Sequence, residues 1–351
     1  MKITLATKKI ITRNSSPLFI AEIGSNHNGS TVLARKLLVK AKSAGADFVK
    51  FQSWSTSSIF SKVKYRENFF LNDDYRDRSD TSLKKIVSKY SISEKQLILL
   101  NELSKKIGIS LISTPFSNKE VDFIVKRLKV PCIKIASMDL NNYPFIDYIA
   151  RQKKPIILSI GMGTLQEIDK AIRIIENRNN KNIVILHCLS IYPAPLAKIN
   201  LERIETLKKN YSYPVGFSDH SIGSSVSIAA IAKGATLIEK HFTLDKNMEG
   251  WDHKLSADPK EMKNLIQDCK NAKLALGNPR IIRTESKARV NEFRRSIVAS
   301  RDIKKGEIFA LDMLDFKRPG RGLSPGDIEF VIGKKSKRNI SYDEIIKKED
   351  F

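Results

Sequence analysis

The chain has 351 residues, of which 41% are hydrophobic, and a formal net charge of +24. This length and composition fit one large domain and one small domain with a sizeable core. No run of 18 apolar residues and no apolar signal-peptide core is present, so we expect neither a membrane span nor a secretory signal. The three cysteines lie far apart in the sequence, and the expected location is therefore a reducing cytoplasm.

The positive charge has two interpretations. One is nucleic-acid binding, and the other is a lysine-rich solvated surface with a preference for anionic substrates. Basic residues are spread along the chain, and no basic motif interleaved with aromatic residues occurs. We therefore expect small anionic ligands rather than nucleic acid.

Eight short apolar runs alternate with segments of helical spacing. The runs expected to form strands are residues 18–23, 46–52, 109–117, 130–137, 154–159, 182–188, 214–217 and 235–238. The segments expected to form helices are residues 31–44, 93–106, 120–128, 143–152, 165–176, 200–208 and 222–233. Residues 53–80 interrupt this pattern with a long polar and aromatic insertion, the kind of loop that often forms a lid. Eight β units over about 250 residues predict a (β/α)8 TIM barrel, with a doubly wound open sheet as the rival fold.

Polar residues stand where the apolar runs stop. In a (β/α)8 barrel these positions form the active-site face. They are Glu22, Lys50, Gln52, Thr114, Lys134, Ser137, Ser159, Tyr192, Ser218, His220 and His241. Neutral imidazole is a common ligand of Mn, Fe or Zn, so His220 and His241 at the ends of two successive runs predict a metal site. Two unrelated loop histidines are the alternative.

The C-terminal part differs from the barrel in composition. We expect the barrel over residues 1–278, a basic linker over residues 279–295 and a small β-rich module over residues 296–351. A module of this size has too small a core to be self-sufficient and is expected to lean on the barrel or on a partner subunit.

Several motifs, taken together and in order, resemble the sialic acid synthase family, which includes N-acetylneuraminate synthase and its legionaminic and pseudaminic acid relatives. They are AEIGSNHNG from Ala21, VKFQ from Val49, STPFS from Ser113, KIAS from Lys134, LHC from Leu186, YPAP from Tyr192, FSDH from Phe217, EKHFT from Glu239 and KRPG from Lys317. The last motif matches the family's C-terminal antifreeze-like (SAF) domain.

The resemblance implies an activity and an assembly. Such an enzyme condenses phosphoenolpyruvate with an N-acyl mannosamine-type aldehyde and water, and it releases phosphate and a nine-carbon 2-keto acid. A divalent metal, Mn²⁺ or Mg²⁺, is used. The resemblance also implies a domain-swapped homodimer in which the SAF domain caps the partner's barrel.

The resemblance further implies roles for individual residues. The catalytic residues would be Glu22, His220 and His241, and the two histidines would also bind the metal. Phosphoenolpyruvate would be held by Lys50, Thr114, Lys134, Ser137, Ser190 and Ser218. The sugar would be contacted by Gln52, Asp139, Tyr192, Asp252 and Arg318. The alternatives are that the lysines pair with core carboxylates, that Glu22 only orients a ligand and that Arg318 is an exposed turn residue.

Three positions depart from the family pattern, and they bear on the sugar more than on the reaction. Asp139 stands where many relatives have Glu, Ser190 where some have Asn or Thr, and Ile160 where Thr is common. We therefore expect a modified acceptor, such as a 2,4-diacetamido-6-deoxy hexose, to be at least as good as N-acetylmannosamine. The competing hypotheses are a phosphoenolpyruvate-dependent aldol synthase acting on a phosphorylated sugar and a non-catalytic sugar-binding protein.

Overall fold

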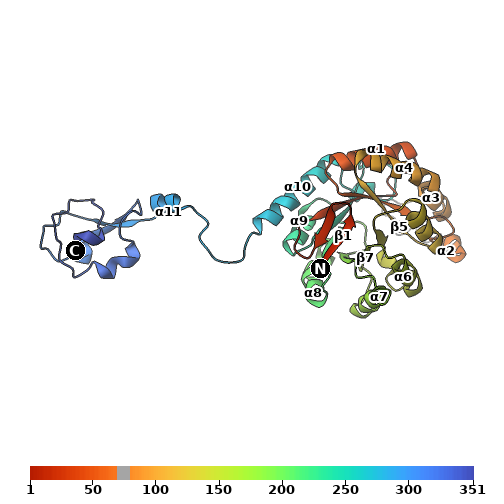
Figure 1. The fold of residues 1–351 in the computed structure, drawn as a ribbon. Helices are drawn as coiled ribbons and strands as arrows, with labels where there is room; N and C mark the ends of the chain where they lie inside the picture. The colour runs from red at the N-terminus through yellow and green to blue at the C-terminus, as the bar shows by residue number, and fades with distance from the viewer. Residues whose placement is uncertain (69–79) are drawn as a thin grey trace. The chain divides into compact units, whose positions relative to one another are not determined.

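The computed structural model describes residues 1–68 and 80–351, which fold as two compact units, Met1–Gly277 and Asn278–Phe351 (Figure 1). In the first unit a closed barrel of parallel strands has the order β10-β3-β4-β5-β6-β7-β8-β9. The strands are β3 (Leu18–Gly24), β4 (Phe48–Ser53), β5 (Ser110–Pro115), β6 (Ile133–Ile135), β7 (Ile156–Ser159), β8 (Ile183–Cys188), β9 (Val215–Asp219) and β10 (Leu237–His241). The predicted (β/α)8 barrel is confirmed, and the doubly wound alternative is excluded.

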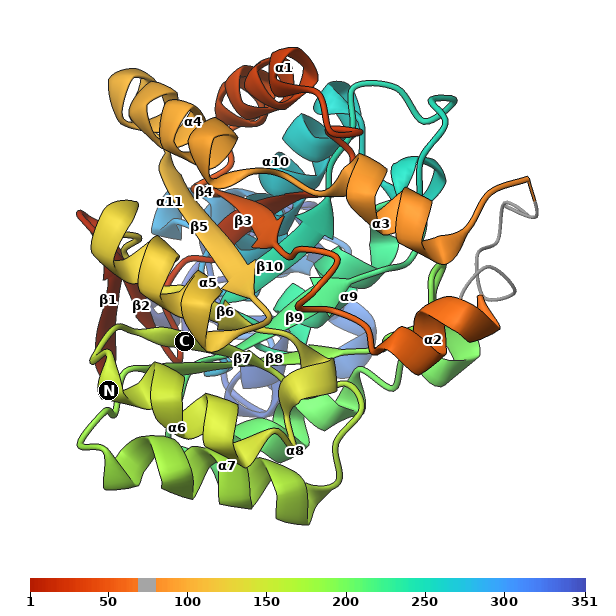
Figure 2. The ribbon, with the colours of Figure 1, turned by 90° about the vertical axis from the view of Figure 1, so that its right-hand side faces the viewer.

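Helices surround this barrel (Figure 2). They are α1 (Thr31–Ser43), α4 (Glu94–Ile107), α5 (Asn118–Asp122), α6 (Tyr143–Arg151), α7 (Leu165–Asn177), α8 (Glu202–Asn210), α9 (Ser225–Ala232) and α10 (Pro259–Ala275). Local sequence sets their ends. Helix α4, for example, begins at a capping box between Ser93 and Gln96 and stops at Gly108, whose φ of 71° lies in the left-handed region that glycine favours.

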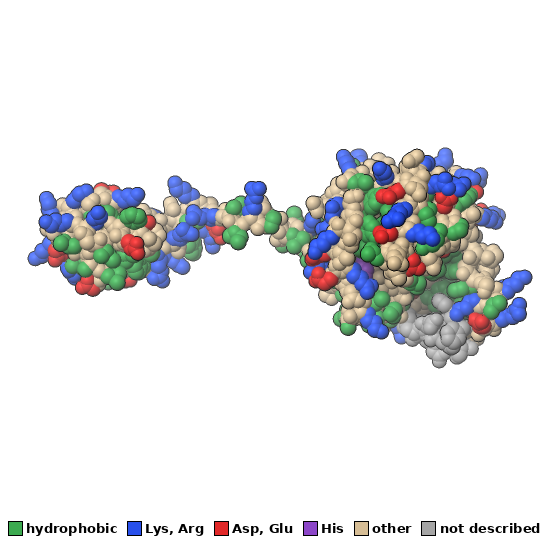
Figure 3. All heavy atoms as spheres, turned by 90° about the horizontal axis from the view of Figure 1, so that it is seen from below, with side chains coloured by type: hydrophobic (Ala, Val, Ile, Leu, Met, Phe, Trp, Pro, Cys, Tyr) green, Lys and Arg blue, Asp and Glu red, His purple; other side chains and the backbone are tan. Residues whose placement is uncertain are grey.

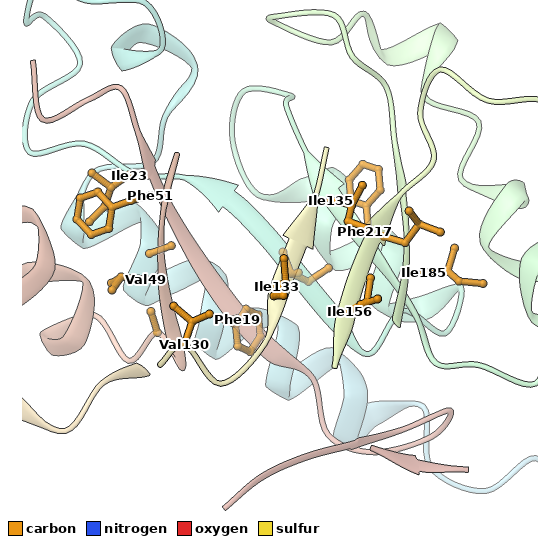
Figure 4. Packing of buried hydrophobic residues seen from close by; sticks show 14 of the residues in the cluster. Phe19, Ile23, Val49, Phe51, Val130, Ile133, Ile135, Ile156, Ile185 and Phe217 are labelled. Atoms are coloured by element: carbon orange, nitrogen blue, oxygen red, sulfur yellow. The ribbon is translucent and has the colours of Figure 1, made fainter. Parts of the chain in front are cut away.

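The main core lies between the strands and the surrounding helices, where side chains such as Phe19, Phe51 and Phe217 are buried (Figure 4). These residues project outward because alternate side chains of a strand point to opposite faces. A second cluster fills the N-terminal end of the barrel. There a hairpin of β1 (Lys2–Ala6) and β2 (Lys9–Thr12), which the sequence analysis did not predict, packs its apolar side chains against the early residues of the barrel strands.

Several predicted boundaries shift. The strand expected over residues 130–137 is only three residues long, because a 3-10 turn (Ser137–Asp139) begins soon after it. The helix expected over residues 120–128 is α5 followed by a π-helical turn, and the last strand continues to His241. The insertion contains α2 (Lys62–Glu67), and its residues 69–79 lie outside the described residues. Helix α3 (Leu83–Tyr90), which was not predicted, follows the insertion.

The second unit has a small core of its own. Strands β11 (Ser296–Ala299) and β12 (Leu314–Lys317) pair antiparallel, and isolated bridges and 3-10 turns make up much of the rest. Buried side chains such as Ile297, Phe309 and Val331 form its core. Residues 279–295 are not wholly an irregular linker, because they contain helix α11 (Lys287–Phe293), which is capped by Ser286.

Basic side chains are distributed over the surface. Figure 3 shows lysine and arginine side chains scattered over the visible face of each unit, with acidic side chains among them. This distribution agrees with a solvated basic surface. None of the helices in the described part of the chain has the length and apolarity that a membrane span requires.

Candidate active site

Two neighbouring strands carry the first charged pair of the candidate site. Glu22 on β3 lies opposite Lys50 on β4, and its Oε2 is 2.9 Å from the Lys50 Nζ. Gln52, two residues further along β4 and so on the same strand face, donates a 2.6 Å hydrogen bond to Glu22 Oε1. Lys50 also donates to Thr114 Oγ1 at 3.1 Å. The ion pair is almost fully buried, so it lies in an environment where charge interactions are strong.

A second lysine lies on the far side of another carboxylate. Glu239 Oε1 is 3.8 Å from both Lys50 Nζ and Lys134 Nζ, and it accepts a 3.0 Å hydrogen bond from Ser218 Oγ. Lys134 donates to Ser159 Oγ at 2.6 Å. The two lysines and two carboxylates therefore form one buried network, so both lysines have carboxylate partners, as the alternative of core ion pairs expected.

No role was predicted for Glu239, which belongs to the EKHFT motif, or for Ser159, a polar residue at a strand end. A signal for Glu239 was present, because it lies two residues before His241 on one strand. Alternation then gives both side chains the same face. For Ser159 the sequence offered no signal beyond a polar residue at a strand end.

The two carboxylates differ in proton affinity. Burial raises the pKa of Glu22, and the repulsion from Glu239 adds to this, although Lys50 opposes both. Burial would also raise the pKa of Glu239, but Lys134, Lys50 and the Ser218 hydroxyl outweigh it and hold the pKa below its ordinary value. Neighbouring carboxyl groups whose pKa values are pushed apart can take different acid–base roles. Glu22 is thus the one suited to exchange a proton.

His220 and His241 lie beside this network with their ring centroids 5.5 Å apart. The Nδ1 of His220 is 2.7 Å from the carbonyl oxygen of Leu189. A carbonyl can only accept, so Nδ1 carries the proton and Nε2 is the acceptor nitrogen of the ring. Ser218 Oγ lies 3.4 Å from this Nε2 and also donates to Glu239. Burial lowers the pKa of His220 to about 4 and lowers that of His241 well below its ordinary value. Both imidazoles are therefore neutral near pH 7, as metal ligands must be.

One carboxylate and one aromatic ring lie next to these histidines. His241 Nδ1 is 3.5 Å from Asp252 Oδ2, and the Tyr192 ring lies 4.2 Å from the His220 ring, centroid to centroid. Within residues 1–68 and 80–351, no cluster of three or more His, Cys, Asp or Glu side chains is arranged as a metal site. The chain thus offers two imidazole ligands, and the remaining positions of a catalytic metal would be left to water and substrate.

The other predicted site residues are brought together only in part. Ser137 and Ser190 hydrogen-bond to each other at 2.6 Å. Gly161 stands beside Ser190, and a Cβ there would come within 2.6 Å of Cys188 Sγ and 3.1 Å of Ser190 Oγ, so a larger residue would force Cys188 to shift. Asp139 follows on the turn after β6 and accepts from Asn142, while its buried Oδ2 has no hydrogen-bond partner among residues 1–68 and 80–351. Arg318 belongs to the second unit, where its guanidinium lies over the Phe293 ring.

The sequence matches two family models. The NeuB family model covers residues 37–280, and the SAF domain model covers residues 294–351. The N,N'-diacetyllegionaminic acid synthase of Campylobacter jejuni is 40% identical over 94% of this chain and 98% of its own length. The human N-acetylneuraminate-9-phosphate synthase is 32% identical over 95% of this chain and 92% of its own.

A solved structure agrees with these matches. The N-acetylneuraminic acid synthetase of Leptospira borgpetersenii superposes with a TM-score of 0.73 at 31% identity. The match covers 82% of this chain and 94% of that one.

Proposed function

Because this chain belongs to the NeuB family, we propose that it is a synthase that condenses phosphoenolpyruvate with an N-acyl mannosamine-type sugar and water. The products are a nine-carbon 2-keto sugar acid and phosphate. The observation that carries the proposal is the buried network of Lys50, Lys134, Glu22 and Glu239 beside two neutral histidines. The family relationship makes the chain an enzyme of the acid-synthase type.

The charge balance of the network bears on how an anion binds. Two lysines and two carboxylates cancel, so phosphoenolpyruvate would bring uncompensated negative charge into a buried site. A divalent cation and one added proton would together offset that charge. Glu22, whose pKa is raised, is the group that takes up a proton most readily. Lys50 and Lys134 would then donate to the phosphate and carboxylate, assisted by the hydroxyl groups of Thr114, Ser137, Ser190 and Ser218.

His220 and His241 would hold Mn²⁺ or Mg²⁺. When bound there, a divalent cation acts as a Lewis acid that polarises the sugar's aldehyde. The protein's own contribution is to keep His220 in one tautomer through Leu189 and to keep both imidazoles neutral. Tyr192 and Asp252 border the same place and would contact the sugar.

Glu22 would act as the general acid and base of the reaction. In the condensation, C3 of phosphoenolpyruvate forms a bond to the aldehyde carbon, water adds to C2 and phosphate leaves. The attacking water must lose two protons in all, of which the aldehyde oxygen gains one and the departing phosphate gains the other. Glu22 is held by Gln52 and Lys50, and its raised pKa suits it to exchange these protons.

Four of the loops at the barrel mouth lack cationic side chains, although the loop after β10 carries Lys246 and Lys254. Despite the net charge of +24, the segments 136–142, 160–164, 189–197 and 220–224 contain no Lys or Arg. Exposed Met138, Met162 and Ile222 lie on them instead. A sugar phosphate would find no cationic partner on these loops. This argues against the phosphorylated-sugar alternative, and together with Asp139, Ser190 and Ile160 it supports a 2,4-diacetamido-6-deoxy acceptor.

The proposed assembly is a domain-swapped homodimer in the cytoplasm, in which Arg318 of the SAF domain reaches the N-acyl group of the sugar in the partner's barrel. A guanidinium donates to such a carbonyl without any change of protonation. The small core of the second unit supports a role that depends on a neighbouring surface.

A panel of acceptors tests the proposal. The protein is incubated with phosphoenolpyruvate, Mn²⁺ and one sugar at a time: N-acetylmannosamine, its 6-phosphate and 2,4-diacetamido-6-deoxy hexoses. Phosphate release and product mass are measured. The proposal requires sugar-dependent release and a nine-carbon acid, fastest with an unphosphorylated sugar. Preference for the 6-phosphate would support the alternative, and phosphate release with no sugar would contradict condensation.

A further inference from the structure

A second buried ion pair lies on the outer side of the barrel wall, behind the two histidines. Lys240 on β10 is the register partner of Asp219 on β9, and its Nζ is 3.1 Å from Asp219 Oδ2. Glu239 contacts the lysines of the candidate site, so alternation turns the neighbouring Lys240 outward, where it lines a cavity with Glu261 of α10. The Asp219 side chain is 0% exposed and the Lys240 side chain is 2% exposed.

This pair holds the turn that follows His220. Asp219 Oδ1 accepts from the backbone N–H of Ser221 at 2.8 Å and from its hydroxyl at 2.6 Å, while Oδ2 accepts from Ser227 Oγ at 2.6 Å. Lys240 Nζ donates to the carbonyl oxygen of Ser221. Both backbone polar groups of Ser221 are therefore bound by the pair, so the residue directly after His220 is fixed in position.

His220 is held from its other sides as well. Its carbonyl oxygen accepts from the backbone N–H of Ala194 at 2.9 Å, and its ring donates to the Leu189 carbonyl oxygen at 2.7 Å. Leu189 and Ala194 belong to the loop after β8, whereas Ser221 is held from β9 and β10. The ring direction thus depends on two independent attachments, and the pair supplies one of them.

We propose that the Asp219–Lys240 pair is a positioning device for His220, which keeps the ring in hydrogen-bond contact with Leu189 and so fixes the direction of its Nε2. The proposal rests on the metal-binding role proposed above for His220. A buried ion pair is weak evidence for stability, because removing two charges from water offsets much of their attraction. Its geometric effect on Ser221 is therefore the more informative property.

The alternative is that the pair only stabilises the barrel wall. Three variants and one control separate the two roles. Asp219→Leu with Lys240→Met removes both charges and both hydrogen bonds to the Ser221 backbone together, so no unpaired buried charge remains to unfold the protein. Lys240→Met alone leaves Asp219 unpaired. Lys240→Arg keeps the charge, and the adjoining cavity of about 250 Å³ gives room for the larger guanidinium.

The control is Asn101→Ala. This substitution removes another buried hydrogen bond, from the Asn101 side chain on α4 to the Leu128 carbonyl oxygen at 2.9 Å. Helix α4 precedes β5, away from β9 and β10 in the barrel order. The Asn101→Ala variant therefore shows what a loss of stability alone does to the site.

The first readout needs no metal. Full-length protein labelled with ¹⁵N-histidine contains only five histidines, and the His220 ring signal is assigned with a His220→Ala variant. We expect a protected Nδ1–H in the wild type, in Lys240→Arg and in Asn101→Ala. We expect rapid exchange of this proton in the double variant. An unchanged His220 signal in a folded double variant would overturn the proposal.

The second readout is Mn²⁺ affinity of the metal-free protein, measured by calorimetry. Loss of a side chain that orients a ligand weakens metal binding by about 10- to 100-fold, and we expect this loss in the double variant. Lys240→Arg should recover most of it. Equal losses in the double variant and Asn101→Ala at matched stability would refute positioning. If the wild type binds no Mn²⁺ while the ring proton still depends on the pair, the metal role of His220 fails and the positioning role stands.

Discussion

Replacing Lys134 by Ala should strongly weaken the use of phosphoenolpyruvate. The Lys134 ammonium is 2.6 Å from Ser159 Oγ and 3.8 Å from Glu239, and it is 3% exposed. Losing one charge-assisted hydrogen bond to a buried anion costs about 2 kcal/mol. The substitution also leaves Glu22 and Glu239 opposed by Lys50 alone, and the excess negative charge adds roughly 1 kcal/mol of repulsion. The sum of about 3 kcal/mol corresponds to a roughly 150-fold fall in kcat/KM.

The assay is phosphate release at saturating sugar and varied phosphoenolpyruvate. Lys105→Ala, an exposed lysine on α4, is the matched control and should leave kcat/KM unchanged. Adding Glu239→Gln to Lys134→Ala removes the excess negative charge, so the double variant should lose less than the two single effects combined. The reasoning would be refuted if both Lys134→Ala and Lys50→Ala kept wild-type kcat/KM for phosphoenolpyruvate.

Three further outcomes are expected. Chelation should abolish phosphate release, and Mn²⁺ or Mg²⁺ should restore it. Full activity of His241→Ala after chelation would contradict the assignment of His241 as a metal ligand. Arg318→Ala should weaken sugar binding but spare phosphoenolpyruvate. A mixed dimer of one Arg318→Ala subunit and one His241→Ala subunit should recover about half of wild-type activity if the SAF domain is swapped. Activity no higher than that of the single variants would exclude the swap. Burial lowers the pKa of His27 from 6.5 to about 4, so the unfolded chain binds this proton first as the pH falls. The free energy of unfolding should therefore decrease from pH 6.5 towards pH 4. Chemical denaturation should show that His27→Gln reduces the slope of this free energy against pH by up to about 1.4 kcal/mol per pH unit, and an unchanged slope would contradict this account.

The barrel was predictable because its strands are buried on both faces and read as continuous apolar runs. Polar residues at the ends of those runs then identified the active-site face. The N-terminal hairpin was not predicted, since Ile3, Leu5 and Ile11 acquire a partner only when the barrel end closes against them. The early end of β6 was missed for a related reason. The apolar pattern continues to Ala136, but the backbone turns at Ser137.

The site was predictable to the level of residue type and position. The sequence supplied Glu22, Lys50 and both histidines as polar strand ends, but it did not indicate that Glu239 stands between the two lysines at 3.8 Å from each. That position depends on how the barrel closes from β10 onto β3. The pKa difference between Glu22 and Glu239 likewise arises from burial and neighbours, which no linear motif encodes.

The most direct test of the proposed condensation follows the oxygen of water. The reaction with phosphoenolpyruvate, Mn²⁺ and the best acceptor sugar is run in H₂¹⁸O, and the masses of phosphate and organic product are measured. Attack of water on the enol carbon breaks the C–O bond, so the account predicts phosphate without ¹⁸O and a nine-carbon 2-keto acid. Phosphate carrying ¹⁸O, together with pyruvate and unchanged sugar, would show simple phosphate hydrolysis and contradict the account.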